Sequence, residues 1–310
     1  MNLLPKGLWP VMITPFKSNN QIDIEGLERL TNMYLDAGSN GMFANCLSSE
    51  MYQLTTDERL LLTSSVVNFC QDKVPVVATG TFKRGGASNT DFIKKIYDTG
   101  INAVILITSM LVEPDESDDI LKSRLEEIMN ETGNIPLGVY ECPVPYKRLL
   151  STDMLRWMAS TGRFVYHKDT SCNSISLERK SAVVKGTNFG LYNADTATAL
   201  DSLESGARGI SPISANFYPE PYSYLLNDFF TNGRTEKLNQ LHALLTMMDR
   251  VTHTFYPFSA KLFLQKRGLK IETNSRIPTE TLTNVDTIRF NALMDSFKVI
   301  SEMYDIKSVL

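Results

Sequence analysis

The chain has 310 residues, 43% of them hydrophobic, so it can bury a substantial core, and we expect most of it to be ordered. Its 31 basic and 35 acidic side chains give a net charge of −4, which is too balanced for an electrostatic grip on phosphate backbones and disfavours a nucleic-acid binder. The most apolar run, residues 101–112, is far shorter than the roughly 20 residues of a membrane helix. Pro5, Pro10 and Pro15 interrupt the N-terminal segment, which has no signal-peptide pattern. We therefore expect a cytoplasmic protein that does not bind membranes.

The four cysteines, Cys46, Cys70, Cys142 and Cys172, are scattered along the chain without paired spacing. This distribution argues against both a disulfide framework and a zinc site. We expect no disulfide, no metal and no organic cofactor.

Short apolar runs alternate with amphipathic stretches, and the runs begin about 20 to 35 residues apart, the length of a strand, a helix and two short loops. We expect eight strands, at residues 8–14, 40–46, 75–80, 102–108, 136–141, 164–168, 188–193 and 208–213. No Gly-x-Gly-x-x-Gly turn follows the first run. The pattern therefore predicts an α/β fold, a closed (β/α)₈ TIM barrel, over an open sheet.

Only helical patterns follow the eighth run, and they contain more helix than a barrel needs to close. We expect a (β/α)₈ barrel over residues 1–232 and a C-terminal helical region, an appendage to the barrel, over residues 233–310. Pro212 lies inside the eighth run and lacks the N–H that a ladder requires, so we expect that strand to be short or bulged there.

Reactive groups in such barrels stand at the carboxyl ends of the strands. Lys168 closes the sixth run, where burial would favour a neutral amine that can attack a carbonyl. Tyr140, near the end of the fifth run, can donate or accept a proton. A surface lysine and a core tyrosine are the alternatives that position alone leaves open.

Successive side chains of a strand face opposite ways. If Lys168 points into the barrel, Tyr166 does too, and His167 points toward the helices as a packed structural residue. We expect His242 and His253, in the helical region, to be structural as well.

Gly138, on the strand next to that of Tyr166, occupies a position that also faces the barrel interior. We expect the two residues to lie in one layer, with the phenol of Tyr166 filling the space that Gly138 vacates and placing a hydroxyl below Lys168.

A series of short motifs runs along nearly the whole chain. They are Ile13-Thr14-Pro15-Phe16; Ser49-Glu50 with Leu54-Thr55 and Glu58; Tyr140-Glu141-Cys142-Pro143; Lys168-Asp169; residues 206–210; Ala215-Asn216 before Pro219; and Lys261, Gly268-Leu269, Arg276 and Pro278. In this order and at these intervals the chain resembles the class I aldolases that include dihydrodipicolinate synthase and N-acetylneuraminate lyase. The resemblance implies a barrel with a helical C-terminal part, commonly tetrameric, that acts on pyruvate or a related 2-keto acid.

By position, Lys168 resembles the lysine that forms the imine in this family, and Tyr140 resembles the tyrosine that shuttles protons. Residues 46–50 correspond to the loop that holds the keto-acid carboxylate, in which Ser48 and Ser49 keep hydroxyls suited to an anion.

The chain also departs from the family. Leu47 stands where many relatives have a threonine that relays protons, and Met110-Leu111 stands where they have a second tyrosine. Val144-Pro145 replaces the arginine that follows the tyrosine segment in dihydrodipicolinate synthase, with Lys147 and Arg148 slightly downstream. These departures weigh against the lysine-biosynthetic activity.

We therefore predict a Schiff-base-forming aldolase or lyase acting on pyruvate or a related 2-keto acid. A dehydratase of a sugar-derived 2-keto acid and a catalytically weak keto- or sugar-acid-binding protein are the alternatives. Asp195, Thr196 and Ser211, after the seventh and eighth runs, are candidates for binding the distal hydroxyls of a substrate, or else ordinary turn formers. The resemblance further implies a homo-oligomer, a tetramer or a dimer.

Overall fold

Eight short strands form the centre of the structure, a computed structural model that describes residues 3–279 and 281–310. The strands are β1 (Gly7–Leu8), β2 (Met42–Asn45), β3 (Val76–Thr79), β4 (Ala103–Ile107), β5 (Leu137–Tyr140), β6 (Phe164–Asp169), β7 (Gly190–Asn193) and β8 (Gly209–Ile210). Each strand falls within or overlaps one of the eight predicted apolar runs. Strands that are buried on both faces are apolar along their whole length, which is why apolar runs in the sequence predict them.

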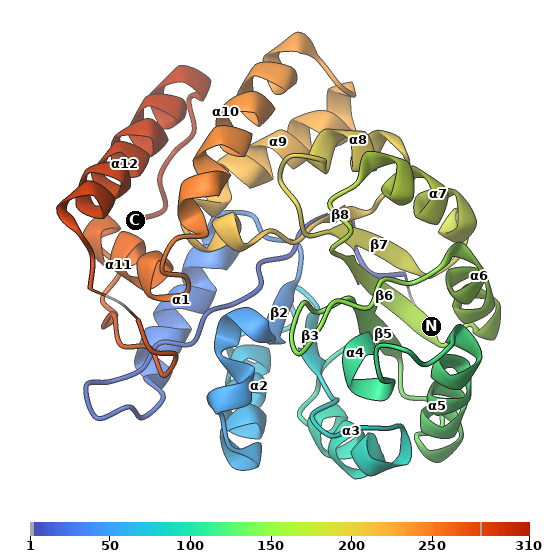
Figure 1. Ribbon diagram of the computed structural model, residues 1–310. Helices are drawn as coiled ribbons and strands as arrows, with labels where there is room; N and C mark the ends of the chain where they lie inside the picture. The colour runs from blue at the N-terminus through green and yellow to red at the C-terminus, as the bar shows by residue number, and fades with distance from the viewer. Residues whose placement is uncertain (1–2, 280) are drawn as a thin grey trace.

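The strands pair in parallel, in the order β1-β8-β7-β6-β5-β4-β3-β2. The segment after β1 closes the ring, because Val11 forms a parallel bridge with Phe43 of β2. The N–H of Met12 also donates to the carbonyl of Phe43 at 3.0 Å. The predicted (β/α)₈ barrel is confirmed (Figure 1).

Helices surround the barrel and follow its strands in turn (Figure 1). They are α1 (Ile24–Asp36), α2 (Thr56–Cys70), α3 (Thr90–Tyr97), α4 (Thr108–Leu111), α5 (Asp118–Glu131), α6 (Thr152–Thr161), α7 (Ser174–Val184) and α8 (Ala199–Glu204), with 3₁₀ turns at Leu47–Ser49, Met51–Gln53, Ala87–Asn89 and Ile213–Asn216. Capping residues determine where helices begin, as α2 illustrates. The hydroxyl of Thr55 accepts a hydrogen bond from the N–H of Glu58, and the carboxylate of Glu58 accepts one from the N–H of Thr55. This capping box begins α2.

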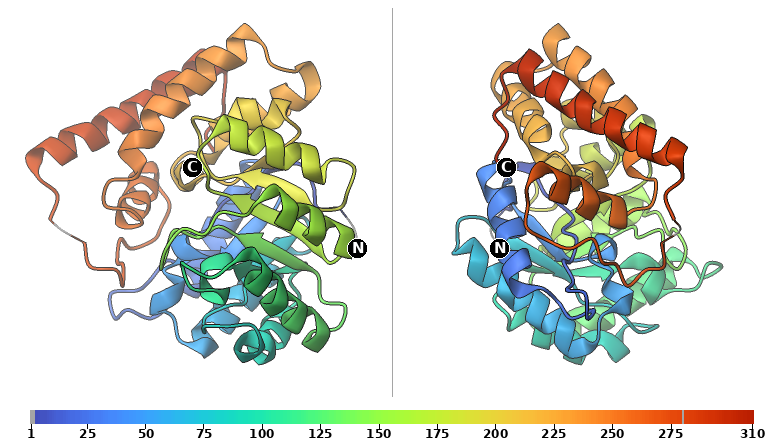
Figure 2. Two further views of the ribbon diagram at one scale, coloured as in Figure 1. Left: turned by 45° about the vertical axis from the view of Figure 1, so that its right-hand side comes forward. Right: turned by 90° about the vertical axis from the view of Figure 1, so that its left-hand side faces the viewer.

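Four further helices complete the described chain: α9 (Pro219–Asn232), α10 (Glu236–Thr252), α11 (Phe258–Arg267) and α12 (Asn284–Tyr304). Helices α10 and α12 pack side by side and extend from the barrel (Figure 2). Helices α10, α11 and α12 form the expected C-terminal helical part. A domain boundary at residue 232 stays a prediction, and residues 1 and 2 of its first unit lie outside the described residues.

Two hydrophobic layers, one inside the barrel and one between the sheet and the helices, follow from the alternation of strand side chains. Tyr166 lies in the inner layer and packs against Trp9 and Tyr192. His167 faces the outer layer, where its ring lies 6.0 Å from that of Phe189. The predicted orientations of Tyr166 and His167 are confirmed.

The eighth strand is short, as Pro212 predicts. It ends at Ile210, and Pro212 instead precedes the 3₁₀ turn Ile213–Asn216. The missing N–H of proline therefore falls where the ladder has already stopped.

Gly138 pairs directly with Tyr166, so the predicted shared layer is present. The prediction that the phenol of Tyr166 fills the space beside Gly138 is wrong. A methyl group on Gly138 would lie 2.5 Å from Cδ1 of Ile105 and 2.8 Å from the carbonyl oxygen of Tyr166, so Ile105 and the backbone of β6 occupy the space. The phenol of Tyr166 instead stacks on Tyr192, with ring centroids 4.5 Å apart.

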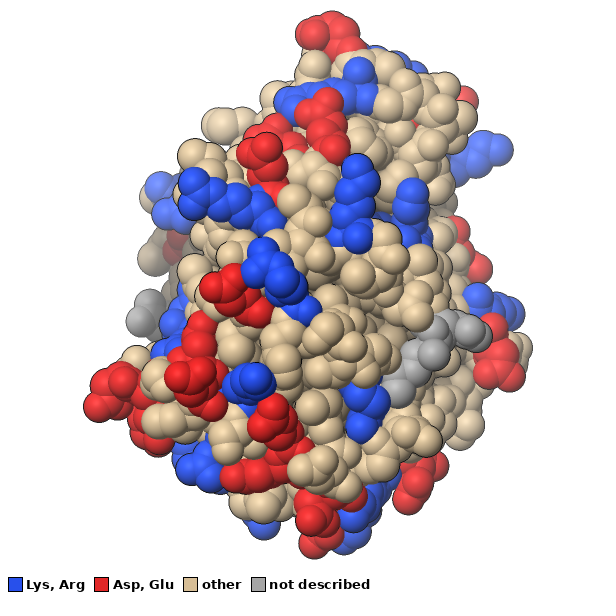
Figure 3. Space-filling model, turned by 90° about the vertical axis from the view of Figure 1, so that its right-hand side faces the viewer, with Lys and Arg blue, Asp and Glu red and all other residues tan. Residues whose placement is uncertain are grey.

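Acidic and basic side chains are interspersed on the face drawn in Figure 3, in keeping with the near balance of charges in the sequence. Among the described residues, every helix is too short or too polar to cross a lipid bilayer.

Candidate active site

A cavity of about 420 Å³ opens beside the carboxyl ends of the strands. Its walls come from the turn after β2, the ends of β5, β6 and β7, and the C-terminal segment between α10 and α11. This is the end of a (β/α)₈ barrel at which strand ends and loops converge on a substrate.

Lys168 reaches this cavity from the end of β6 and is 3% exposed. Its Nζ lies 4.7 Å from the ring centroid of Tyr140 and 5.9 Å from that of Phe43. Among the described residues, no carboxylate lies within ion-pair distance of Nζ. Burial lowers the pKa of Lys168 to about 8, although the nearby thiols of Cys46 and Cys142 raise it slightly. A substantial fraction of the amine is therefore neutral near physiological pH.

Tyr140 lies directly opposite Lys168 in the ladder between β5 and β6. Burial raises the pKa of its phenol well above the usual value, and Cys142 and Cys46 add to the increase. The phenol therefore keeps its proton at physiological pH and can donate it beside the amine.

The turn after β2 brings one of its two predicted serines to the cavity. Ser48 lines it, whereas the hydroxyl of Ser49 is within 2.7 Å of the carbonyl oxygens of Met12 and Ala44 and accepts from the N–H of Cys46 at 3.1 Å. Because its donor and acceptor capacity is used internally, Ser49 holds the turn in shape and does not line the cavity.

Of the three predicted distal residues, only Asp195 lines the cavity. The hydroxyl of Thr196 is bound to Asp249 and to the phenol of Tyr222, each at 2.9 Å. Ser211 is fully buried and donates to the carbonyl of Trp9 at 2.6 Å. Thr196 and Ser211 are thus part of the framework behind the wall.

Tyr166 does not present its hydroxyl to the amine either. That hydroxyl lies 3.5 Å from Ser211 Oγ, so its only hydrogen bond among the described residues leads away from Lys168. The hydroxyl expected below Lys168 is therefore engaged elsewhere.

The helical region contributes five cavity residues that were not predicted as site residues: Asp249, His253, Tyr256, Pro257 and Ile277. His253 Nε2 lies 3.1 Å from Asp249 Oδ2, and this hydrogen bond raises the pKa of the imidazole. The turn after α10 places the half-exposed ring of His253 at the cavity, and the expectation that this residue is structural stays a prediction. His242 instead contacts the carbonyl of Thr196 at 2.7 Å.

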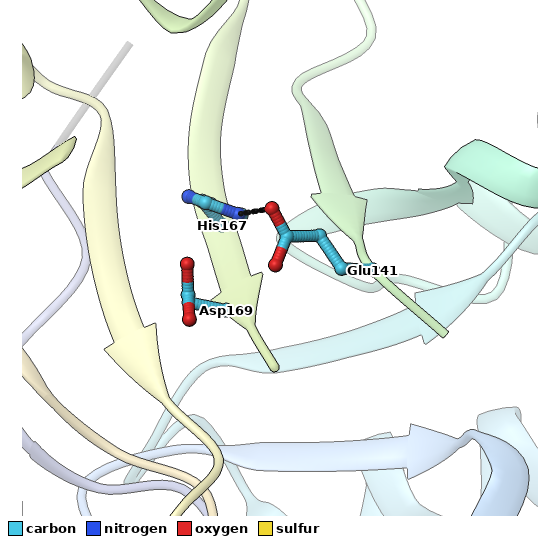
Figure 4. Close-up of side chains that lie close together, drawn as sticks. All are labelled: Glu141, His167 and Asp169. Carbon is cyan, nitrogen blue, oxygen red and sulfur yellow. Dashed lines mark ion pairs between the residues drawn. The ribbon is translucent and has the colours of Figure 1, made fainter. Parts of the chain in front are cut away.

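Glu141, His167 and Asp169 gather on the opposite face of β5 and β6, within 4.8 Å of one another (Figure 4). Such a group has the composition of a metal site. Here Lys180 of α7 fills the position of the cation, because its Nζ lies 2.6 Å from Glu141 and 2.5 Å from Asp169. The donors thus fit a buried ammonium ion, and we assign no metal to them.

The carboxyl group of Glu141 is ionised and Lys180 carries its charge. Burial alone would raise the pKa of Glu141, but contact with His167 and the charge of Lys180 outweigh it and lower that pKa to about 2. Burial likewise opposes the charge on Lys180, yet the two carboxylates raise its pKa. The ion pairs tie α7 to the strands that carry Tyr140 and Lys168.

A (β/α)₈ barrel with a buried lysine at its carboxyl-terminal mouth, which has no ion-pair partner among the described residues, is the arrangement that a class I aldolase requires. Residues 4–296 match the profile of the dihydrodipicolinate synthetase family. The chain belongs to this family, whose members are lyases that make or break carbon–carbon bonds.

Two curated relatives illustrate the similarity. The 4-hydroxy-tetrahydrodipicolinate synthase 1 of Halalkalibacterium halodurans is 26% identical over 275 residues, which cover 88% of this chain and 90% of the relative. The 4-hydroxy-tetrahydrodipicolinate synthase of Bacillus subtilis is 26% identical over 285 residues, which cover 91% and 95%.

Solved structures show the same fold. The dihydrodipicolinate synthase of Bacillus anthracis superposes with a TM-score of 0.85 at 23% identity, over 96% of this chain and 99% of that one. The 4-hydroxy-tetrahydrodipicolinate synthase of Methylacidiphilum fumariolicum also gives 0.85, at 20% identity, over 97% and 98%.

Replacing Lys180 by Met should destabilise the protein by about 3–5 kcal/mol, because two buried carboxylates lose their counter-ion. Denaturant unfolding measures the effect. Arg179→Met, one residue earlier on the exposed face of α7, is the matched control and should stay within about 0.5 kcal/mol of the wild type. Equal effects of the two substitutions would contradict the assigned role of Lys180.

Proposed function

We propose that this enzyme is a Schiff-base-forming aldolase or lyase that acts on pyruvate or a related 2-keto acid through Lys168. The observation that carries the proposal is the position of Lys168, a buried lysine without an ion-pair partner among the described residues, which faces a cavity beside the phenol of Tyr140. Membership of a family of class I aldolases supports it. A neutral amine in a cavity of this size is the nucleophile that a ketone requires.

The reaction begins with attack of the neutral Lys168 amine on the ketone carbon of the substrate, whose carboxylate lies near Ser48. A carbon–nitrogen bond forms, and the carbonyl oxygen takes up a proton to become a hydroxyl. Tyr140 supplies the proton with which this hydroxyl departs as water, leaving an iminium ion. The phenolate of Tyr140 then takes a proton from C3 to give an enamine, whose electron pair forms a bond to the carbonyl carbon of a second substrate; the oxygen of that carbonyl takes up a proton, and water hydrolyses the resulting iminium to release the product and the Lys168 amine.

The distal wall of the cavity favours a partner without a negative charge. It carries Asp195, Asp249 and His253, and among the described residues Lys168 is the only lysine or arginine in the lining. The nearby Lys147 donates to the carbonyl of Thr170 at 2.9 Å and is not part of the wall. A carboxylate on the second substrate would be repelled by the acidic side chains of Asp195 and Asp249. Hydroxyl groups on that substrate could instead donate to these carboxylates and accept from His253.

This wall weighs against 4-hydroxy-tetrahydrodipicolinate synthase activity, for which the two curated relatives are named. It favours a hydroxylated aldehyde as partner, or dehydration of a sugar-derived 2-keto acid on the same imine. A weakly catalytic binding protein for such acids is the remaining alternative. A panel of aldehydes and sugar-derived keto acids, assayed with the purified enzyme, separates these three possibilities. An aldolase joins pyruvate to an aldehyde, a dehydratase converts a sugar-derived keto acid alone, and a binding protein leaves every compound of the panel unconverted.

Two further statements accompany the proposal. We propose a tetramer or a dimer for this chain, as its resemblance to the family implies. We also propose that it works in the cytoplasm.

Incubation with pyruvate and borohydride should add a reduced pyruvyl group to the wild-type chain, and Lys168→Ala should abolish the addition, because no other described amine faces the cavity. Intact-mass measurement detects the adduct. Lys147→Ala, which removes an exposed lysine that contacts Thr170 of the cavity lining, should leave it unchanged. An adduct on the Lys168→Ala variant would refute the assignment.

The rate of adduct formation should rise with pH and level off above about 8, the lowered pKa of Lys168. Below that pKa the neutral, nucleophilic fraction of the amine falls about tenfold for each pH unit. Trapping rates measured from pH 6 to 10 in constant ionic strength give the midpoint. A midpoint near 10.5, the value of a solvated lysine, would mean that burial does not activate the amine.

Tyr140→Phe should leave the adduct detectable but slow turnover by about 10²-fold or more, the usual effect of removing a positioned acid or base. The comparison needs a substrate pair found with the panel, assayed at saturation. Turnover equal to that of the wild type would assign Tyr140 to the packing of the barrel interior.

A further inference from the structure

The C-terminal helical region contains a second cavity, of about 280 Å³, between the end of α10, the start of α11 and the start of α12. Among the described residues, it shares no lining residue with the cavity that holds Lys168. The end of α10 separates the two cavities, because Asp249 and His253 line the first whereas Arg250 and Thr254 line the second. The second cavity is therefore not an extension of the active site.

The interior of this second cavity combines apolar side chains with one hydroxyl that lacks a partner. Its apolar lining residues are Val251, Phe255, Leu262, Leu282 and Phe290. Ser259 also lines the cavity and is 4% exposed, and its hydroxyl has no hydrogen-bond partner among the described residues. A buried hydroxyl without a partner costs free energy, and a ligand that bonds to it removes this cost. The cavity thus favours a ligand with an apolar body and one polar group.

The lining also carries a net positive charge. It contains Arg250, Arg289 and a single carboxylate, that of Asp286. This carboxylate is already engaged, because it accepts from the N–H and the hydroxyl of Thr283 at 3.1 and 2.6 Å and lies 3.7 Å from the guanidinium of Arg289. Arg250 is exposed and has no ion-pair partner among the described residues. Its guanidinium can therefore bind an anion, and a carboxylate matches the planar arrangement of its donors.

We propose that this cavity is a second ligand-binding site, which takes a small carboxylate with an apolar body that carries a hydroxyl. The carboxylate of the ligand pairs with Arg250, its body packs against Phe255 and Phe290, and its hydroxyl bonds to that of Ser259. The site is independent of the proposed function, because its ligand does not meet Lys168 and needs no ketone.

Three probes separate the contributions of the charge and of the hydroxyl. The first, 3-(4-hydroxyphenyl)propionate, has all the proposed features in about twelve non-hydrogen atoms, and its dissociation constant should be about 1 mM or lower at an ordinary binding energy per atom. The second, 3-(4-hydroxyphenyl)propionamide, lacks the charge. The third, 3-phenylpropionate, lacks the hydroxyl. None of them is a keto acid, so none forms an imine with Lys168.

Isothermal titration calorimetry on the full chain measures binding to the wild type and to three variants. Arg250→Gln should weaken binding of both acids by about fivefold or more and change that of the amide by less than about twofold, because only the acids pair with the guanidinium. Ser259→Ala should weaken binding of the hydroxylated acid by a similar factor and leave that of 3-phenylpropionate unchanged. Lys270→Gln, which removes an exposed charge of the same region outside the cavity lining, should match the wild type.

Two controls separate ligand binding from effects on the fold and on the active site. Ser259→Ala should not lower the free energy of unfolding of the ligand-free chain, because its hydroxyl has no partner to lose among the described residues. Arg250 is exposed, so Arg250→Gln keeps the test decisive if the serine variant unfolds. Lys168→Ala should retain full binding of the hydroxylated acid, since Lys168 does not line this cavity.

The inference is overturned if the wild type binds none of the three probes at concentrations up to about 10 mM. Equal affinities for the acid and the amide, or equal losses in Arg250→Gln and Lys270→Gln, would overturn it as well. Loss of binding in Lys168→Ala would place the acid in the active site and contradict a second site. None of these results bears on the proposed function, which pyruvate trapping tests separately.

Discussion

The proposed chemistry of Lys168 depends on a separation of charge across two strands. Glu141 and Asp169 follow Tyr140 and Lys168 directly in the sequence. Because side chains alternate, both carboxylates face the helices, where Lys180 binds them. A carboxylate beside the amine of Lys168 would hold that amine protonated and deprive it of its lone pair. The outer ion cluster therefore lets the inner lysine remain without a counter-ion.

A second buried ion pair assembles the wall of the cavity. Glu50, in a left-handed conformation at φ 58°, accepts from Nζ of Lys261 at 2.7 Å and from the backbone N–H of Arg276 and Ile277 at 2.6 and 3.0 Å. The turn that carries Ser48 is thereby fixed to the C-terminal segment. Residues far beyond the eighth strand are thus structural parts of the site, and the helices that follow the barrel do more than cover it.

Much of the fold could be predicted from the sequence, since parallel strands buried on both faces are apolar throughout and Pro212 marks where the last one stops. Lys168 and Tyr140 were predictable as a pair, because the carboxyl ends of neighbouring parallel strands meet at one edge. The hydroxyl groups that line the cavity were harder to predict. Ser49 and Ser211 have suitable chemistry and position, but whether a hydroxyl faces a substrate or a backbone carbonyl depends on contacts that residue type does not reveal.

Asp249, His253 and Tyr256 could not be found from spacing, because helical periodicity in α10 gives the packed face of a helix and says nothing of where its end meets the barrel. The same limit applies to the reading of Leu47 as a lost relay group. A leucine at position 47 removes a hydroxyl from the cavity only if no other element supplies one nearby. The segment after α10 brings Tyr256 to the same cavity wall as Leu47. Since polar groups in a closed site need partners, the hydroxyl capacity of this cavity must be counted over all the elements that line it.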